Sequence, residues 1–321
     1  MSGQLVAIGI DLGGTHTRVA VVGPDGALRH ERRTRTPAHS LTDLMATISD
    51  SVAAVRAEAS ASGDEVDAVG IGIAALVDPD GVARYAPNLP GVKDAPLRAA
   101  LADDTGLRVV VDNDANVAAW GELVHGAARG TRNALVITLG TGIGGGIIID
   151  GRVYRGAHGF AAEVGHWQYD PAGPACACGQ AGHWEAHGSG TALGRLAREA
   201  ARRGDAPSVL ALADGDPDRV TGFAVGDAAR AGAPDALALL DRYADHVAIG
   251  CAGLMQVLDP ERIVVSGGLV ALGDLLLDRI RDRIPLHLAG HAFRPAVPVV
   301  AAELGDAAGM VGAAVLTRHP S

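Results

Sequence analysis

The chain alternates between short apolar runs and longer segments with helical spacing. Leu41, Leu44, Ile48, Val52 and Val55 recur at steps of three and four residues, which predicts a helix over residues 41–61. Apolar or alternating runs that predict strands lie at residues 5–10, 17–22, 28–35, 66–73 and 107–111. Strands that alternate with helices indicate an α/β sheet with helices packed on it.

A second series of the same kind begins after residue 113. Strands are expected at residues 134–139, 262–266 and 297–302, with a hairpin over 146–154 that turns at Asp150 and Gly151. Helices are expected at residues 115–124, 272–284 and 307–317, and a mostly helical stretch at 183–258. Residues 176–182 are too rich in glycine and cysteine for regular structure. The two series resemble each other, which favours two lobes.

Composition agrees with two lobes and excludes several classes of protein. The chain has 321 residues, about twice the ~150 of a typical domain. Hydrophobic residues make up 48%, so a large core can form, and a net charge of −10 argues against nucleic acid or anionic lipid as a partner. No apolar run reaches the ~18 residues of a membrane span, and residues 1–4 lack the charged start of a signal peptide. Three cysteines do not suggest a disulfide framework, so we expect a soluble, cytoplasmic protein.

The first candidate for chemistry is the turn after the first strand. Gly13 and Gly14 allow backbone N–H groups to approach a phosphate closely, and the hydroxyls of Thr15 and Thr17 add donors. Asp11 at the end of the strand can hold a magnesium ion or its water shell. The alternative is an ordinary hairpin turn. Neither a Rossmann fingerprint nor a Walker motif is present.

A second glycine-rich segment covers residues 140–146. It includes Gly140, Thr141, Gly142 and Gly144. Each glycine costs roughly 1 kcal/mol relative to alanine in regular structure, so packing alone does not account for five of them. We interpret the segment as a backbone cradle for a second phosphate, with a flexible hairpin as the alternative.

A polar cluster follows the strand at residues 107–111. Asp112, Asn113, Asp114 and Asn116 lie where that strand passes into a helix. One such residue suffices for an N-cap, which is the simplest reading. Four within five positions suggest that at least Asp114 faces a substrate hydroxyl and acts as a base.

In this order and spacing, the three segments resemble the signature of the actin-like sugar kinases. Residues 163–166 and 176–185 further resemble the signature of the ROK family of repressors and sugar kinases, in particular its actinobacterial glucokinases. The resemblance extends over essentially the whole chain. It also includes residues 86–89, 118–122, 266–268 and 304–309.

The resemblance implies a two-lobed, actin-like ATPase (ribonuclease H-like) fold, with mixed sheets flanked by helices. Residues 1–113 would form a small lobe, joined by a C-terminal helix at 305–321, and residues 114–304 a large lobe with a zinc-binding loop. It also implies sugar contacts from Asn88, Asn113, Asp114, Glu163, His166 and Glu185, although either glutamate in isolation could be a surface charge. The resemblance also implies that Gly267 and Gly268 form the turn on the adenosine side of the nucleotide. Without the resemblance, two glycines between a strand and a helix would not indicate a nucleotide site.

A metal site can be argued from the donor set as well. His166, Cys176, Cys178 and His183 offer two imidazoles and two thiols within eighteen residues, which suits tetrahedral zinc. The family has a third cysteine where this chain has His183, and His187 is a rival fourth ligand. An unmetallated loop is the alternative. The resemblance implies that the zinc is structural and shapes the sugar pocket.

These observations together predict an ATP-dependent hexose kinase. Glucose is the favoured substrate, phosphorylated on its 6-hydroxyl with Asp114 as general base and with Mg²⁺ on the nucleotide. A kinase for N-acetylmannosamine, fructose or mannose, a polyphosphate donor, and a non-catalytic sugar sensor are the alternatives. Family kinases commonly have proline where this chain has Ala74 and Ala75, which bears on the choice of sugar. A repressor would need a DNA-binding segment before the first strand. A homo-oligomer, dimer or tetramer, is expected.

Overall fold

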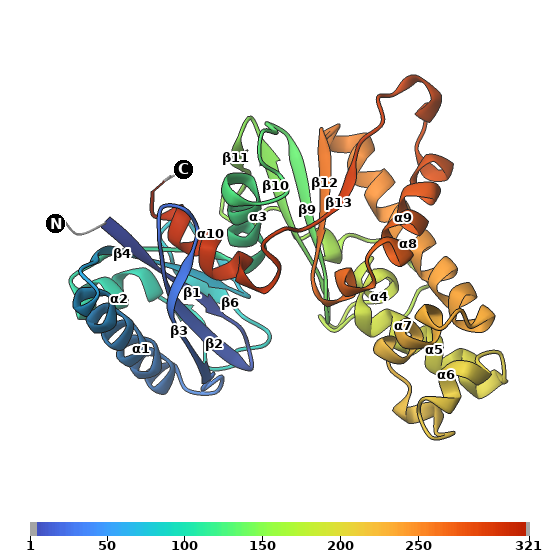
Figure 1. Ribbon diagram of the computed structural model, residues 1–321, viewed down its shortest axis with the longest axis horizontal. Helices are drawn as coiled ribbons and strands as arrows, with labels where there is room; N and C mark the ends of the chain where they lie inside the picture. Colours follow the sequence, from blue (N-terminus) through green and yellow to red (C-terminus); the bar gives the residue numbers. More distant parts are fainter. Residues whose placement is uncertain (1–4, 319–321) are drawn as a thin grey trace. The chain divides into compact units, whose positions relative to one another are not determined.

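The computed structural model describes residues 5–318; residues 1–4 and 319–321, which include both ends of the predicted small lobe, lie outside the described part. The first strand lies at the centre of a five-stranded sheet with the order β3-β2-β1-β4-β8 (Figure 1). Its strands are β1 (Leu5–Leu12), β2 (His16–Val22), β3 (Leu28–Arg35), β4 (Glu65–Ile73) and β8 (Arg108–Asn113). Strands β1, β4 and β8 are parallel, and β2 and β3 are antiparallel to their neighbours.

Helices cover both faces of this sheet. Helix α1 (Leu41–Ala61) buries Leu44 and Ile48 in one core with Ile8 and Ile10 of β1. Helix α2 (Leu97–Thr105) contributes Leu97 and Leu101 to the same core. On the other face, α3 (Asp114–His125) and α10 (Ala308–Leu316) pack on each other, and α10 lies along β1 and β4 (Figure 1).

Two glycines permit the close approach of α10. A Cβ atom on Gly9 would lie 1.9 Å from the carbonyl oxygen of Met310, and one on Gly70 would lie 1.7 Å from that of Ala313. Any side chain at these positions would push the helix away from the sheet. The C-terminal helix is thereby fixed to the first strand of the chain.

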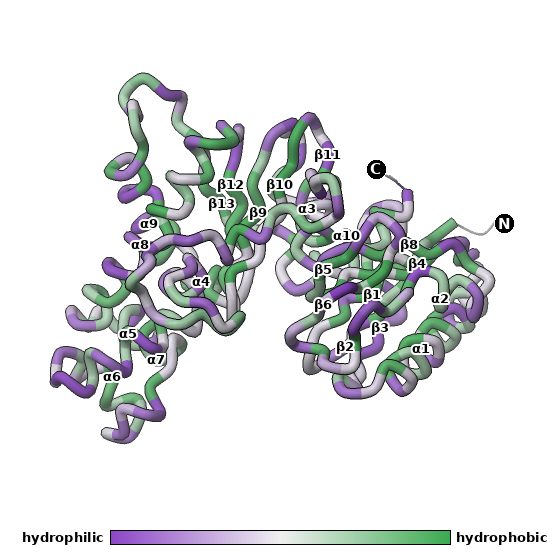
Figure 2. Tube along the Cα trace, turned by 180° about the vertical axis from the view of Figure 1, so that it is seen from behind, coloured by the Kyte–Doolittle hydropathy of each residue, from purple (hydrophilic) through white to green (hydrophobic). Residues whose placement is uncertain are grey.

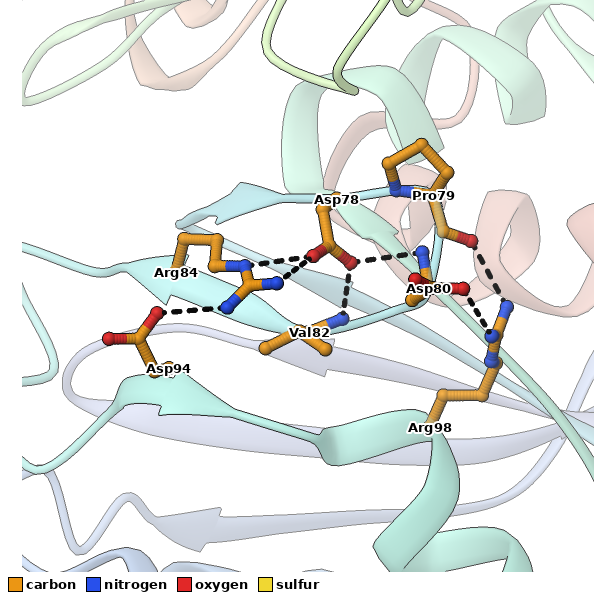
Figure 3. Close-up of polar contacts among 7 residues, drawn as sticks. All are labelled: Asp78, Pro79, Asp80, Val82, Arg84, Asp94 and Arg98. Atoms are coloured by element: carbon orange, nitrogen blue, oxygen red, sulfur yellow. Dashed lines mark hydrogen bonds and ion pairs between the residues drawn. The ribbon is translucent and has the colours of Figure 1, made fainter.

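A small three-stranded sheet follows β4 and was not expected from the sequence. It consists of β5 (Leu76–Val77), β6 (Ala83–Tyr85) and β7 (Lys93–Ala95). The Asp78 carboxylate accepts hydrogen bonds from the backbone N–H groups of Asp80 and Val82 and pairs with Arg84 at 2.7 Å (Figure 3). Arg84 also reaches Asp94 at 3.1 Å, so one arginine ties the turn after β5 to β7.

The second large sheet has the order β11-β10-β9-β12-β13. Its strands are β9 (Ala134–Leu139), β10 (Ile143–Ile149), β11 (Arg152–Val153), β12 (Arg262–Ser266) and β13 (Val299–Ala301). The tube is mainly green, hence hydrophobic, along β9 and β10 (Figure 2), and most residues of β9 are buried. The hairpin between β10 and β11 turns at Asp150 and Gly151, as predicted.

Helices follow this hairpin, and within residues 183–258 they confirm the mostly helical stretch predicted there. They are α4 (Glu185–Gly188), α5 (Gly190–Arg203), α6 (Pro207–Ala211), α7 (Gly222–Arg230), α8 (Pro234–Leu258) and α9 (Asp274–His287). Short 3-10 turns lie at Val164–His166, Pro217–Arg219, Gly268–Leu272, His291–Phe293 and Gly305–Ala307. Trp184 is fully buried, and its indole N–H donates to the carbonyl of His246 at 2.9 Å, which anchors α4 on α8.

The chain divides into two compact units. One comprises the residues up to Val136, Gly146–Ala162 and the chain from Glu303 on; the other comprises Ile137–Gly145 and Glu163–Ala302. The small lobe ending at residue 113 and the large lobe over residues 114–304 that the resemblance implies stay a prediction. Within residues 5–318, no helix combines the length and the apolar character needed to cross a membrane.

Candidate functional site

The first glycine turn follows β1 in the first unit. The N–H of Gly13 donates to the carbonyl of His16 at 3.1 Å, which closes the turn. A Cβ atom on Gly14 would lie 2.7 Å from the carbonyl oxygen of Asn88, so the absence of a side chain lets the Asn88 loop contact the turn. The exposed side chain of Asn88 is therefore close to the Gly14 backbone, although the two are 74 positions apart in sequence.

Thr17 lies in β2, directly after this turn, and is fully buried. Its hydroxyl forms a hydrogen bond of 3.0 Å with that of Thr36, which in turn donates to the carbonyl of Gly13 at 2.8 Å. Thr17 thus supports the turn from inside. Its hydroxyl is bonded to Thr36 and is therefore not a candidate for contact with phosphate, whereas the turn that contains Gly13, Gly14 and Thr15 remains a candidate.

Asp11 is close to other acidic side chains at the end of β1. Burial, and then the negative charge of Asp114, raise the pKa of Asp11 from 3.8 to about 6; Arg18 lowers it and Asp306 raises it. A Cβ atom on Gly309 would lie 2.8 Å from the carboxyl carbon of Asp11, so α10 passes directly beside this group. A partly buried carboxylate among other carboxylates suits a hydrated magnesium ion.

The start of α3 shows which residue of the polar cluster is the N-cap and which could act as a base. Asn113 is the N-cap, and its side-chain oxygen accepts from the N–H groups of Ala115 and Asn116 at 2.9 and 3.2 Å. Its amide nitrogen donates to the carbonyl of Ala75 at 3.2 Å. Asp114 is the first helical residue and is not needed as the cap. The simplest reading therefore explains Asn113 and leaves Asp114 available.

The carboxylate of Asp114 is poorly solvated. Burial raises its pKa above the usual 3.8, the N–H groups of Ala115 and Asp114 lower it, and the charge of Asp112 raises it again. One carboxylate oxygen accepts from the N–H of Ala115 at 2.9 Å. A raised pKa makes this carboxylate a stronger base than an exposed aspartate, as general-base chemistry requires.

The second glycine turn is held by α4 and α5. The carboxylate of Glu185 accepts from the N–H of Ile143 at 3.0 Å, and a Cβ atom on Gly142 would lie 2.1 Å from the same carboxylate oxygen. The N–H of Gly190 donates to the carbonyl of Gly140 at 2.8 Å. The hydroxyl of Thr191 donates to the carbonyl of Thr141 at 2.7 Å. Sequence reasoning missed Thr191, because no local motif marks it.

The extent of this turn corrects one expectation. Only residues 140–142 form the turn, because β10 begins at Ile143 and contains Gly144, Gly145 and Gly146. A Cβ atom on Gly146 would lie 2.3 Å from that of Ala119, so this glycine lets α3 pack against the strand. Contrary to the expectation from the sequence, packing therefore does require a glycine at position 146.

Gly267 and Gly268 follow β12 and precede a 3-10 turn. Gly267 has a φ of 91°, which favours glycine, and a Cβ atom there would lie 2.5 Å from the carbonyl oxygen of Leu139. Leu139 is the residue before the second glycine turn, so the structure brings these two turns together. The helix expected from residue 272 begins at Asp274, because residues 268–272 form the 3-10 turn.

The four candidate metal ligands form one cluster. One ligand atom each from His166, Cys176, Cys178 and His183 all lie within 4.8 Å of one another. Cys178 Sγ is 3.3 Å from Nδ1 of His183, and Cys176 Sγ is 3.7 Å from Nδ1 of His166. Two imidazoles and two thiols at this spacing fit the tetrahedral coordination of zinc.

His187 is not a member of this cluster. Its ring lies 4.7 Å from that of Tyr169 and 5.1 Å from that of His246, measured between centroids. Its Nε2 is buried and has no hydrogen-bond partner in the described part of the chain. The cluster therefore favours His183 over His187 as the fourth ligand.

Glu185 contacts both the metal cluster and the second glycine turn. The thiol of Cys176 donates to Oε1 of Glu185 at 3.2 Å, while Oε2 accepts from Ile143. Burial raises the pKa of Cys176 to about 12, and the nearby Glu185 carboxylate adds to this. The other candidate sugar ligand, Glu163, is exposed and lies 3.9 Å from Nε2 of His166. His166 thus presents one ring nitrogen to Cys176 and the other to Glu163.

Comparisons with known proteins place the chain in a family. The profile of the ROK family matches residues 7–319. The chain is 42% identical over 320 residues to a glucokinase of Streptomyces coelicolor, covering 98% of both chains. It is 35% identical over 318 residues to a glucokinase of Thermotoga maritima, again covering 98% of both.

A solved structure agrees with these relatives. The ROK family glucokinase of Streptomyces griseus, in complex with glucose and AMPPNP, superimposes with a TM-score of 0.84 and 40% sequence identity. The match covers 98% of this chain and 99% of that one, and its fold is that of the actin-like ATPases. The chain described here belongs to the ROK family.

Proposed function

We propose that the protein is an ATP-dependent hexose kinase that transfers the γ-phosphoryl group to the 6-hydroxyl of glucose. The observation that carries this proposal is the start of α3, where Asn113 caps the helix and Asp114 keeps a carboxylate of raised basicity. The similarity to glucokinases over nearly the full chain supports the choice of reaction and of glucose.

In this proposal, Asp114 accepts the proton of the 6-hydroxyl as that oxygen attacks phosphorus. Proton removal by a positioned carboxylate contributes typically ~10²–10⁴-fold to a rate. Asn88, Asn113, Glu163, His166 and Glu185 provide the amide, carboxylate and imidazole groups that hydrogen-bond sugar hydroxyls. Such groups discriminate strongly against sugars that lack a contacted hydroxyl, because they are then left unpaired.

The nucleotide is assigned to the glycine turns. Phosphate is assigned to the turns that contain Gly13, Gly14 and Thr15, and Gly140, Thr141, Gly142 and Gly144, and adenosine to Gly267 and Gly268. The N–H groups of Gly13 and Gly140 donate to the carbonyls of His16 and Gly142, so these two glycines shape the turns and do not donate to phosphate. Asp11 holds the hydrated Mg²⁺, which neutralises charge on the transferring phosphoryl group when bound. The assignment of Gly144 to phosphate has the least structural support in this set, because Gly144 lies within β10 and not in the turn.

The cluster of His166, Cys176, Cys178 and His183 is assigned to one structural zinc ion. Zinc bound by four protein ligands has no open position, so it organises residues around it instead of activating water. Zinc would bind Cys176 as a thiolate, which has no proton to donate to Glu185. The bond from the N–H of Ile143 to Glu185 is therefore the contact that supports a link between this loop and the second glycine turn.

The proposal also includes a homo-oligomer in the cytoplasm. Val257, Leu286 and Phe293 of the second unit are 79%, 75% and 94% exposed, and a subunit interface would cover such side chains. Light scattering of the purified protein measures the mass, and a monomer at micromolar concentration would contradict this part of the proposal.

A substrate panel tests the proposed function. ADP release is followed with glucose, mannose, fructose and N-acetylmannosamine, and with ATP or polyphosphate as donor. We expect the highest kcat/KM for glucose with ATP. A higher kcat/KM for another hexose would change the assigned substrate but not the assigned reaction. Saturable glucose binding without any turnover would indicate a sugar sensor.

A further inference from the structure

The residue before the Asn113–Asp114 pair is a buried carboxylate with a complete set of partners. Asp112 is only 4% exposed. Its Oδ1 accepts from the N–H of Asn113 at 2.7 Å and from the side-chain amide of Asn116 at 3.0 Å. Its Oδ2 accepts from Nε of Arg155 at 2.7 Å. A buried carboxylate is stable only when its charge is compensated in this way.

Arg155 reaches Asp112 from a different part of the first unit. It follows β11, and its side chain is 20% exposed. Its Nη1 donates to the carbonyl of Val153 at 3.3 Å, and its own carbonyl accepts from the N–H of Ala161 at 3.1 Å. The guanidinium is thus fixed by Asp112 and Val153, and the backbone of Arg155 by Ala161. This guanidinium makes the only ion pair of Asp112 found within residues 5–318.

The orientation of Asn116 depends on this ion pair. Asn116 is 1% exposed, and its Oδ1 has no hydrogen-bond partner in the described part of the chain. Its side chain is therefore oriented by the bond from Nδ2 to Asp112. Since Asp112 also accepts from the N–H of Asn113, it holds the first turn of α3 at two positions that flank Asp114 in sequence.

We propose that Arg155 is a positioning residue for phosphoryl transfer: it fixes Asp112, and through Asp112 the first turn of α3, so that the carboxylate of Asp114 is held where the sugar hydroxyl reacts. This inference rests on the proposed function of Asp114. A displacement of about 1 Å at a reacting group can cost about 100-fold in rate. Arg155 touches no reacting atom and acts only through Asp112.

The test uses Arg155→Met, which removes the charge but keeps most of the side-chain volume. We expect kcat to fall about 10- to 100-fold, with the KM values for ATP and sugar within about threefold of wild type. Arg155→Lys should recover part of kcat, because an ammonium group can still pair with Asp112. In Asp112→Asn/Arg155→Met no charge is left unpaired, so its stability should exceed that of Arg155→Met while its kcat stays low.

A matched control removes an ion pair elsewhere in the same unit. Arg29 pairs at 2.8 Å with Asp64, whose side chain is 10% exposed. Arg29→Met should lower the melting temperature but leave kcat unchanged. If Arg155→Met does not fold, Asp112→Asn/Arg155→Met and Arg155→Lys decide instead: wild-type kcat in both would overturn the inference. So would wild-type kcat in a folded Arg155→Met.

Asp114→Asn, measured in parallel, separates this inference from the proposed function. If Asp114→Asn is inactive while Arg155→Met has normal kcat, only the positioning role fails. If Asp114→Asn retains full activity, the assignment of the base fails, whatever the result for Arg155.

Discussion

At the scale of single residues, the carboxylates of Asp11 and Asp114 are held in poorly solvated positions at the expense of stability. Asp11 has a pKa of about 6 because it is buried near Asp114, whereas its ordinary value is 3.8. Between these two pH values, Asp11 binds more protons in the folded protein than in the unfolded chain. The contribution of Asp11 to the free energy of unfolding should therefore fall as the pH rises through this window.

Asp11→Asn tests this cost. The variant removes the buried charge, so its free energy of unfolding should exceed that of wild type at pH 8, by on the order of 3 kcal/mol if the whole shift of Asp11 from 3.8 to about 6 is expressed. Below pH 4 the two proteins should be equally stable. Denaturant unfolding at pH 4 and pH 8, without magnesium and nucleotide, measures both values. If the difference in free energy of unfolding between Asp11→Asn and wild type were the same at both pH values, this explanation would be contradicted.

At the scale of structural elements, α4 and α5 hold the second glycine turn from the side of the metal cluster. Thr191 donates to the carbonyl of Thr141, and Glu185 accepts from the N–H of Ile143. Gly142 approaches Glu185 so closely that any side chain there would displace the carboxylate. The turn is thus positioned by contacts from another segment and does not depend only on its own glycines.

Thr191→Val tests this support for the turn. Valine has nearly the same shape but cannot donate to Thr141. One lost hydrogen bond of ~0.5–1.5 kcal/mol should weaken the binding of Mg-AMPPNP about 2- to 10-fold. Sugar affinity and zinc content should not change. Calorimetric titrations measure both affinities, and Thr47→Val, which removes a hydroxyl bonded to Asp43 in α1, is the matched control. Equal losses of nucleotide and sugar affinity would argue against a specific role.

The metal cluster makes a prediction with a matched pair of histidines. His183 belongs to the group of ligand atoms within 4.8 Å, and His187 does not. Wild type and His187→Gln should therefore contain about one zinc ion per chain, and His183→Gln less than about half of that. Elemental analysis of protein purified without chelator measures the content. If His183→Gln retained zinc and His187→Gln lost it, His187 would be the fourth ligand and His183 would not.

The regular elements were largely predictable from the sequence because their signals are local. The spacing of Leu44, Ile48 and Val52 predicted α1, and the bounds 28–35, 41–61, 134–139 and 262–266 are those observed. Strands β5, β6 and β7 have two or three residues each, too few to show a period. The role of Gly146 was misread because the helix that needs this glycine is remote in sequence.

At the scale of the whole molecule, the chain combines two compact units with local motifs in each. The two glycine turns, the residues around Asp114 and the metal cluster could be found from short sequence patterns. Arg155 and Thr191 could not, because they contact Asp112 and Thr141 across 43 and 50 residues and no spacing rule links them. Supporting residues of this kind follow from the fold alone.

The central claim, that Asp114 is the general base, is tested most directly by kcat of Asp114→Asn. Asparagine keeps the size of the side chain but not its basicity, so kcat should fall about 10²- to 10⁴-fold. The melting temperature should not fall, because Asn113 caps the helix and the variant removes a buried charge, and both substrate affinities should stay near wild type. The control, Asp274→Asn, changes the first residue of α9 and should leave kcat unchanged. An Asp114→Asn protein whose kcat stays within a few-fold of wild type would contradict the account.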